Sequence, residues 1–487
     1  MALVDTRRRH TWNDLDEARR EWAAHLARIG VRPGDRVMVV GENSPAMAMA
    51  LFTVTTAGAW VVNVNARLSA REIGAIRAHS GARRVIYLLE ASPDARAHAQ
   101  ADAGATPFGG EAWGACAISA SNEDAVPEAP TGDAALDVAA LLYTTGTTGE
   151  PKAVMLTHAN LLFIARNSQV LRHLVPEDRV LGLLPLSHVY GMASVGLGSL
   201  MSGASIHFQA RFGPAAAAAW IRDEGLTVCQ GVPAMYAKLV QHLRAQGATR
   251  FEAPALRFLY AGGSPLALEL KRDVEAFFGL PLHNGYGLTE ASPTLTQTRP
   301  ESPRDDVSVG PAIPGVELRL VDREGRDVPE GDVGELWARG PNVMKGYFRN
   351  PEATAQALKA GGWLATGDLA RRDAPGAYFI EGRSKELIIR SGFNVFPVEV
   401  EAVLNAHPSV GQSAVVGRSV DGDEEVVAFV EAAAGASIDE QALQAHCAAQ
   451  LAPYKRPARI VVLAALPAAP SGKVLKGQLA RMARELA

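Results

Sequence analysis

The chain has 487 residues, of which 48% are hydrophobic and 21% charged, and its formal net charge is −4. This composition excludes global disorder, which requires low hydrophobicity and high net charge, and the absence of a basic excess argues against nucleic acid as the main partner. The cysteines, Cys116, Cys229 and Cys447, are too few and too far apart to predict a disulfide scaffold or zinc cluster. We therefore expect a cytoplasmic protein, and we expect no membrane span because the most apolar run, 46–64, is interrupted by Thr, Gly and Asn.

The first hundred residues predict alternating helices and strands. Helices are expected at 12–29, 45–56 and 68–79, and strands at 35–40, 59–64 and 84–89. This alternation is typical of parallel α/β architecture. Residues 100–135, rich in Ala, Gly, Pro and Asp, predict a long surface connection, and the alternation resumes from 138 to about 278.

The second half of the chain changes character twice. Short strands at 317–321 and 334–338, separated by Gly and Pro turns, predict an antiparallel β subdomain. The last hundred residues predict a compact α+β unit, with helices at 398–406 and 440–451 and strands at 412–416, 425–431 and 459–463. The predicted fold class is therefore α/β: a large domain over 1–384, with doubly wound sheets and a small β subdomain, and a smaller mobile α+β domain over 385–487.

The strongest local signal is the string Tyr-Thr-Thr-Gly-Thr-Thr-Gly-Glu-Pro-Lys at 143–152, which follows an apolar strand. Glycine lets the backbone approach an anion closely, and hydroxyls and a lysine add donors and charge, which suits a polyphosphate. It is not a Walker A loop, because Lys152 follows Pro151 and precedes Ala153. The residues predicted to bind phosphate are Thr144, Thr145, Gly146, Thr147, Thr148, Gly149 and Lys152.

Further motifs follow in order along the chain. They are Leu-Pro-Leu-Ser-His-Val-Tyr-Gly at 184–191, Ala-Gly-Gly-Ser-Pro-Leu at 261–266, Asn-Gly-Tyr-Gly-Leu-Thr-Glu at 284–290, Thr-Gly-Asp at 366–368, Gly-Arg-Ser-Lys-Glu at 382–386, Ser-Gly-Phe at 391–393 and Pro-Ser-Gly-Lys at 470–473. With the 143–152 string, this set resembles the adenylate-forming superfamily of acyl-CoA synthetases, firefly-luciferase-like enzymes and peptide-synthetase adenylation domains. The resemblance implies two steps: a carboxylate attacks the α-phosphate of ATP to give an acyl-adenylate and pyrophosphate, and a thiol then attacks the adenylate to give a thioester and AMP.

The resemblance also implies a role for individual residues. Tyr286 would stack on adenine, Asp368 would accept both ribose hydroxyls, and Arg383 would lie near the ribose or phosphate. The other residues implied in nucleotide binding are Gly263, Ser264, Asn284, Gly285 and Gly287. Thr289 would offer a hydroxyl to the phosphate and Glu290 an oxygen ligand to Mg²⁺. Taken alone, Thr289 and Glu290 are more typical of a helix N-cap followed by a first-turn acid, and the family context favours the functional role.

The remaining implied roles concern the two half-reactions. Lys473 would stabilise charge as the carboxylate attacks, although most loop lysines are merely exposed. His188 would border the carboxylate site and position the substrate, and Lys385 would be the pivot of a domain rotation. Ser391 and Gly392 would lie beside the thiol channel. Two departures stand out: Ala153 where relatives usually carry Gly, and Ile389 where some aryl-CoA ligases carry Lys.

The leading interpretation is an AMP-forming acyl-CoA synthetase that uses ATP and CoA as cosubstrates with Mg²⁺. The His188 motif, the Ser391-Gly392 pair and a chain that ends at Ala487 without a carrier segment favour CoA as the acceptor. A fatty acid is the favoured substrate; the alternatives are an aryl or dicarboxylate acid (4-coumarate-, benzoate- or malonate-like), or a carrier protein as acceptor. A non-catalytic nucleotide sensor is disfavoured because it would not need the full set of charged residues.

The sequence says little about the acyl pocket. Its lining is expected near 188–193, 230–232 and Ser264, which are mostly small or apolar residues. Lys238 could meet a second carboxylate, although a solvated helix lysine is the simpler interpretation. The oligomeric state is not predicted.

Overall fold

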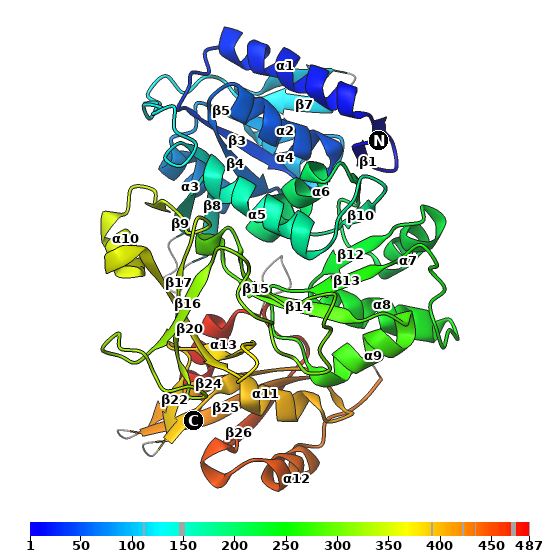
Figure 1. Ribbon diagram of the computed structural model, residues 1–487, viewed down its shortest axis with the longest axis vertical. Helices are drawn as coiled ribbons and strands as arrows, with labels where there is room; N and C mark the ends of the chain where they lie inside the picture. Colours follow the sequence, from blue (N-terminus) through cyan, green and yellow to red (C-terminus); the bar gives the residue numbers. More distant parts are fainter. Residues whose placement is uncertain are drawn as a thin grey trace.

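Two large sheets, each of eight strands, form the framework of the N-terminal part of the chain (Figure 1). The computed structural model describes residues 1–110, 113–145, 151–390, 393–420, 423–433, 435–468 and 474–486. The first sheet contains, in spatial order, β18 (Gly346–Tyr347), β9 (Pro151–Thr157), β8 (Val138–Thr145), β4 (Trp60–Asn65), β3 (Arg36–Gly41), β5 (Arg84–Leu88), β7 (Gly114–Ile118) and β6 (Thr106–Gly110). The second contains β15 (Thr294–Gln297), β14 (Leu282–Gly287), β13 (Phe258–Ala261), β12 (Val228–Gly231), β10 (Arg179–Gly182), β11 (Ser205–Phe208), β1 (Leu3–Val4) and β2 (Arg9–His10). The central strands of both sheets are parallel, as the alternation of helix and strand predicts.

A layer of helices joins the two sheets. It consists of α2 (Pro45–Thr56), α5 (His158–Leu171), η1 (Tyr190–Leu197) and α6 (Gly198–Met201). Helix α2 begins after Ser44, whose hydroxyl accepts a hydrogen bond from the backbone N–H of Met47. It is apolar on nearly every face, which is typical of a helix that is covered on all sides. One continuous apolar core therefore runs from the first sheet, through Met47, to Met192 of η1.

The outer helices cover the remaining faces of the two sheets. They are α1 (Trp12–Arg28), α3 (Ala70–Ser80), α4 (Pro93–Ala101), α7 (Pro214–Asp223), α8 (Pro233–Ala245), α9 (Leu268–Phe278) and α10 (Pro351–Ala357). The surface connection expected at 100–135 is partly wrong, because β6 and β7 form a hairpin that extends the first sheet. Phe108 and Trp113 of this segment bury their rings against Trp22, at centroid distances of 4.6 and 5.5 Å. These isolated aromatic residues anchor a segment whose Gly- and Ala-rich composition hides the pattern of a strand.

The predicted antiparallel β subdomain is present. Its strands are β16 (Glu317–Val321), β17 (Gly334–Arg339), β19 (Leu358–Lys359), β20 (Trp363–Arg372) and β21 (Tyr378–Arg383). Short 3-10 helices lie at η2 (Thr289–Ala291), η3 (Ala360–Gly362) and η4 (Pro453–Lys455). Strands β20 and β21 pair so that Asp368 lies opposite Arg383, which brings two residues of separate motifs together.

The C-terminal part forms a smaller α+β unit with apolar clusters of its own. Its elements are β22 (Ile388–Arg390), β23 (Phe393–Val395), α11 (Pro397–Asn405), β24 (Val410–Val420), β25 (Asp423–Ala432), α12 (Glu440–Gln450), β26 (Arg459–Leu463) and α13 (Lys476–Glu485). This matches the predicted architecture, while the boundary between 384 and 385 stays a prediction. Within the described ranges, no helix is both long and apolar enough to cross a membrane.

Candidate active site

Asp368 is the centre of a buried polar contact between the second large sheet and the β subdomain. Its carboxylate accepts a hydrogen bond from the phenol of Tyr286 on β14 and lies 3.1 Å (Oδ1 to Nε) from the guanidinium of Arg383 on β21. Only 5% of Asp368 is exposed. Burial, and then the charge of Asp368, raise the pKa of Tyr286, so that its hydroxyl remains a donor at neutral pH. The three residues implied in nucleoside binding therefore meet at one point.

Lys152 and Glu290 both lie close to one tyrosine, Tyr347, which the sequence analysis does not single out. The hydroxyl of Tyr347 donates to Glu290 Oε1 at 2.8 Å, and Lys152 Nζ lies 5.1 Å from the centre of its ring. Burial and the neighbouring Glu290 raise the pKa of Tyr347. Strand β18, which carries Tyr347, pairs with β9, which carries Lys152. A cation and a carboxylate are thus held close together beside the phosphate-loop hairpin. In the sequence, the only feature that marks Tyr347 is that it follows Gly346.

Thr289 does not cap a helix, so that alternative is wrong. It is the first residue of η2, the cap position belongs to Leu288, and no side chain caps this helix. Thr289 is buried and Glu290 half-buried. The backbone N–H of Met344 donates to the carbonyl of Glu290 at 2.9 Å, which fixes η2 against the segment leading to β18.

Several predicted residues lie outside the described ranges. They are Gly146, Thr147, Thr148, Gly149, Ser391, Gly392 and Lys473. The frame of the phosphate loop is described: β8 and β9 are antiparallel, with Thr144 opposite Lys152 and Thr145 opposite Pro151. The hairpin therefore returns Lys152 to the start of the threonine-rich loop.

Two motif glycines, Gly285 and Gly287, lie where a side chain would collide with a neighbouring tyrosine or with backbone. A Cβ on Gly285 would lie 1.9 Å from Tyr260 Oη, and one on Gly287 would lie 2.1 Å from the Pro293 carbonyl oxygen. Gly263 has a φ of +81°, a conformation that favours glycine. The amide of Asn284 donates to two backbone carbonyls at 307 and 308, so this side chain supports a neighbouring loop.

The segments expected to line the acyl site come together. Gly262 and Gly263 lie against the ring of Tyr190, and Gly263 also adjoins Val232. His188 and Ser264 are both exposed, and His188 Nδ1 accepts the backbone N–H of Tyr190 at 3.3 Å. Lys238 is exposed on α8, which favours its interpretation as a solvated lysine.

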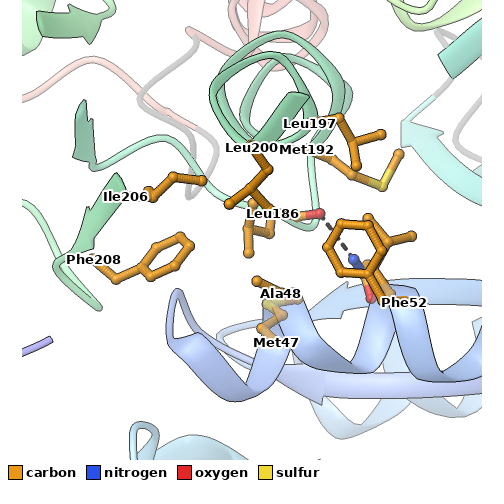
Figure 2. Close-up of a pocket in the computed structure, with 12 residues that line it drawn as sticks. Met47, Ala48, Phe52, Leu186, Met192, Leu197, Leu200, Ile206 and Phe208 are labelled. Atoms are coloured by element: carbon orange, nitrogen blue, oxygen red, sulfur yellow. Dashed lines mark hydrogen bonds between the residues drawn. The ribbon is translucent and has the colours of Figure 1, made fainter. Parts of the chain in front are cut away.

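Two asparagines from the first sheet and the loop after it fix the 184–188 loop. Asn43 donates to the carbonyl of Leu184 at 2.8 Å and accepts from the backbone N–H of Leu186 at the same distance. Asn63 of β4 donates to the carbonyl of Leu186 at 3.1 Å (dashed line in Figure 2). Figure 2 also shows the pocket behind this loop, which side chains such as Met47 and Met192 line. Its almost wholly apolar lining assigns it to packing between the sheets.

An ion-pair cluster lies within the C-terminal part, next to its junction with the rest of the chain. Lys476 of α13 lies 3.3 Å from Glu386 and 2.8 Å from Glu401, measured between the ammonium nitrogen and the carboxylate oxygens. Burial disfavours the charge of Lys476, but the two glutamates outweigh it and raise its pKa. Lys385 beside this cluster is exposed, and Ser384 Oγ donates to the Gly367 carbonyl at 3.1 Å. The predicted pivot is therefore adjacent to the nucleoside-side contact at Asp368.

The carboxylates near the phosphate loop bear on how Mg²⁺ could bind. Among the described residues, no group of three His, Cys, Asp or Glu side chains could hold a metal ion. A single half-buried carboxylate, Glu290, suits a Mg²⁺ that arrives with a triphosphate, because that ion takes most of its ligands from phosphate and water. The residues present therefore fit a substrate-borne ion.

Two family models match most of the chain. The family model described as "AMP-binding enzyme" matches residues 1–348, and that described as "AMP-binding enzyme C-terminal domain" matches residues 399–473. A feruloyl-CoA synthase from Amycolatopsis sp is 36% identical over 474 residues, covering 97% of this chain and 93% of the relative. A 2-succinylbenzoate–CoA ligase from Geobacillus kaustophilus is 35% identical over 484 residues, covering 99% and 95%.

A solved structure shares the fold over the full length. ATP-bound MatB from Rhodopseudomonas palustris superposes with a TM-score of 0.85 at 29% identity, covering 99% of this chain and 96% of that one. The motifs, the fold and these relatives lead to one assignment. The chain belongs to the AMP-binding, adenylate-forming enzymes, in their acyl-CoA synthetase branch, and is an AMP-forming acid–thiol ligase.

Proposed function

We propose that this ligase activates an aryl carboxylic acid and transfers it to CoA. The observation that carries the proposal is the position of the Tyr190 ring against the Gly262 backbone, with the ring of Tyr260 at a centroid distance of 6.0 Å. Aromatic rings beside bare backbone form flat walls, which suit a planar acyl group better than a flexible chain. The names of similar proteins, including feruloyl-CoA synthase and 4-coumarate–CoA ligase, support an aryl acid and lend no support to the fatty acid favoured by the sequence analysis.

In the proposed first step, the residues bind and orient ATP and the acid. Asp368 accepts hydrogen bonds from the ribose hydroxyls, and Tyr286 lies beside the adenine. Lys152 and Thr144 hold the outer phosphates. His188 borders the acid's carboxylate, which is already ionised at neutral pH and needs no general base. An oxygen of that carboxylate bonds to the α-phosphorus, the bond to the bridging oxygen breaks, and pyrophosphate leaves. Lys473 is the proposed cation for this step.

The metal ion and the hinge are the remaining parts of the proposed mechanism. Glu290 would hold Mg²⁺, which when bound neutralises phosphate charge. In the second step the thiol sulfur of CoA attacks the acyl carbon, the thiol proton is lost to solvent, and AMP leaves. We assign the pivot between the steps to Lys385, the thiol channel to Ser391 and Gly392, and the domains to 1–384 and 385–487.

A panel of carboxylic acids scored by ATP–pyrophosphate exchange tests the substrate class. Aryl acids such as 4-coumarate and benzoate should support exchange at higher kcat/KM than straight-chain fatty acids of any length. Faster exchange with a fatty acid or with malonate than with every aryl acid would contradict the aryl assignment and leave the ligase assignment standing.

A further inference from the structure

We infer that Gln230 makes this enzyme select acids with a hydroxyl group at the end opposite the carboxylate. The inference rests on the proposed function, because it takes the acyl group to lie beside Tyr190. It names the residue that recognises the distal end of the substrate and the chemistry that this residue accepts.

Gln230 is a buried amide without a hydrogen-bond partner. It lies on β12 with 0% of its surface exposed, and in the described part of the chain neither its Nε2 nor its Oε1 is hydrogen-bonded. Leaving a buried polar group unpaired costs about 1–3 kcal/mol. The hydroxyl of Tyr190 is likewise buried and unpaired among the described residues. Buried polar atoms that the protein itself does not satisfy indicate a polar group brought by water or ligand.

The position of Gln230 joins it to the acyl site. Gln230 lies opposite Tyr260 in the parallel pairing of β12 and β13, so the two side chains share one face of the sheet. On that face Tyr260 belongs to the same apolar cluster as Tyr190. The hydroxyl of Tyr190 in turn lies 3.4 Å from the place where a Cβ on Gly262 would be. The unpaired amide therefore lies on the same sheet face as the tyrosine rings that adjoin the acyl group in the proposed function.

A buried cation beside this face of the sheet makes the face favourable for an oxygen atom of the substrate. The guanidinium carbon of Arg172 lies 4.7 Å from the centre of the Tyr260 ring, and Arg172 is only 1% exposed. Its N–H groups donate to the carbonyl and hydroxyl of Ser194, at 3.0 and 2.7 Å, and to Gln297 Oε1 at 3.2 Å. None of these acceptors is a carboxylate, so the charge is only partly compensated by dipoles. These N–H groups of Arg172 already have acceptors, so Arg172 contributes a positive electrostatic potential. Gln230 makes the direct contact with the substrate oxygen.

The chemistry of an amide decides which oxygen fits. The side chain of Gln230 presents both a donor and an acceptor. A hydroxyl can accept from Nε2 and donate to Oε1, whereas a carboxylate only accepts and would face the Oε1 lone pairs. A distal hydroxyl is thus preferred over both a hydrogen atom and a second carboxylate.

Three acids of one shape test this inference: 4-coumarate, cinnamate and 4-carboxycinnamate. The wild type should show a kcat/KM for CoA-thioester formation at least about tenfold higher with 4-coumarate than with cinnamate, since a site built to hydrogen-bond a hydroxyl rejects the analogue without it. In Gln230→Leu the ratio of the two kcat/KM values should fall to within about twofold of one, because the amide that distinguishes the two acids is gone. Gln209→Leu, at a buried glutamine that donates to the Ala216 carbonyl, is the matched control and should keep the wild-type ratio.

Each other outcome counts against the inference. An unchanged ratio in Gln230→Leu, or a wild-type preference for cinnamate or 4-carboxycinnamate, would overturn it while leaving the aryl-CoA ligase proposal intact. If the wild type forms no thioester with any aryl acid, the proposed function fails and takes this inference with it. Should the leucine variant not fold, Gln230→Met, which keeps the length of the side chain, takes its place in the same comparison.

Discussion

At the scale of single residues, Tyr347 explains how opposite charges stay in place before any nucleotide binds. Its hydroxyl holds the Glu290 carboxylate, and the face of its ring lies close to the Lys152 ammonium. Without this ring the two charged groups would be free to pair directly, which would occupy the carboxylate proposed to hold Mg²⁺. Tyr347 is therefore a positioning residue for Glu290.

Replacing Tyr347 by Phe should lower kcat/KM for Mg-ATP about tenfold, because one hydrogen bond to a charged group is worth about 1.5–3 kcal/mol. Steady-state pyrophosphate release at varied Mg²⁺ measures the effect, and raising Mg²⁺ should restore part of it. The matched control is Tyr87→Phe, since that hydroxyl also donates to a carboxylate, of Asp102, at 2.9 Å but in the outer part of the first sheet. Equal losses in the two variants would show that Tyr347 is merely structural.

The Asp368 carboxylate should be required for nucleotide affinity. Asp368→Asn removes the charge that faces Arg383 and one acceptor for the ribose, so the Kd for ATP should rise at least about tenfold. Isothermal titration with ATP and with inorganic pyrophosphate checks the role. Pyrophosphate affinity should hold within about twofold, because its contacts are assigned to Lys152 and not to the ribose end. A parallel loss of both affinities would contradict a ribose-specific role.

At the scale of elements, the 184–188 loop depends on a different sheet from the one that carries it. Asn43 and Asn63 reach across from the first sheet and satisfy the backbone of this loop in a buried environment. The loop ends at His188, so the packing of the two sheets against each other sets the position of the proposed carboxylate site.

Asn63→Leu should loosen this loop and leave the Leu186 carbonyl unpaired. The expected effects are a loss of about 1–3 kcal/mol in unfolding free energy and a several-fold rise in the KM for the acid, with an unchanged KM for ATP. Denaturant unfolding and steady-state kinetics measure the two effects. The control is Asn167→Leu, whose amide donates within α5 at 3.1 Å. A change in the KM for ATP as large as that for the acid would argue against loop positioning.

Helices and strands whose apolar residues recur with a clear period could be predicted from the sequence. Contacts between residues far apart in the chain could not. The strand at 317–321 and the helix at 45–56 match their predicted bounds, because alternation and apolar runs report burial directly. The hairpin of β6 and β7 was missed because its burial rests on single aromatic residues, such as Phe108. Tyr347 and Asn63 were missed because a lone tyrosine or asparagine acquires its role only from a partner far away in the chain. The motifs predict Asp368 and Arg383 as site residues, but their mutual contact depends on strand register.

At the scale of the whole molecule, the contacts at Lys476 link the end of the chain to the proposed pivot. Helix α13 begins three residues after Lys473, and its first residue, Lys476, pairs with Glu386, next to Lys385. Any rotation about the pivot would therefore involve the contact between Glu386 and α13.

Lys385→Pro should separate the two half-reactions, because proline fixes φ at the position proposed to change it. ATP–pyrophosphate exchange should stay within about twofold of the wild type, while CoA-thioester formation should fall at least about tenfold. Lys385→Ala removes only the side chain and should leave both steps nearly unchanged. Equal losses in both steps with proline would contradict a pivot at this position.

The most direct test of the account is a product balance. The purified protein is incubated with ATP, Mg²⁺, CoA and 4-coumarate, and all products are quantified by mass spectrometry and chromatography. The account predicts aryl-CoA thioester, AMP and pyrophosphate in equal amounts, and aryl-adenylate with pyrophosphate when CoA is left out. Formation of ADP and phosphate, or AMP release without any thioester when CoA is present, would contradict it.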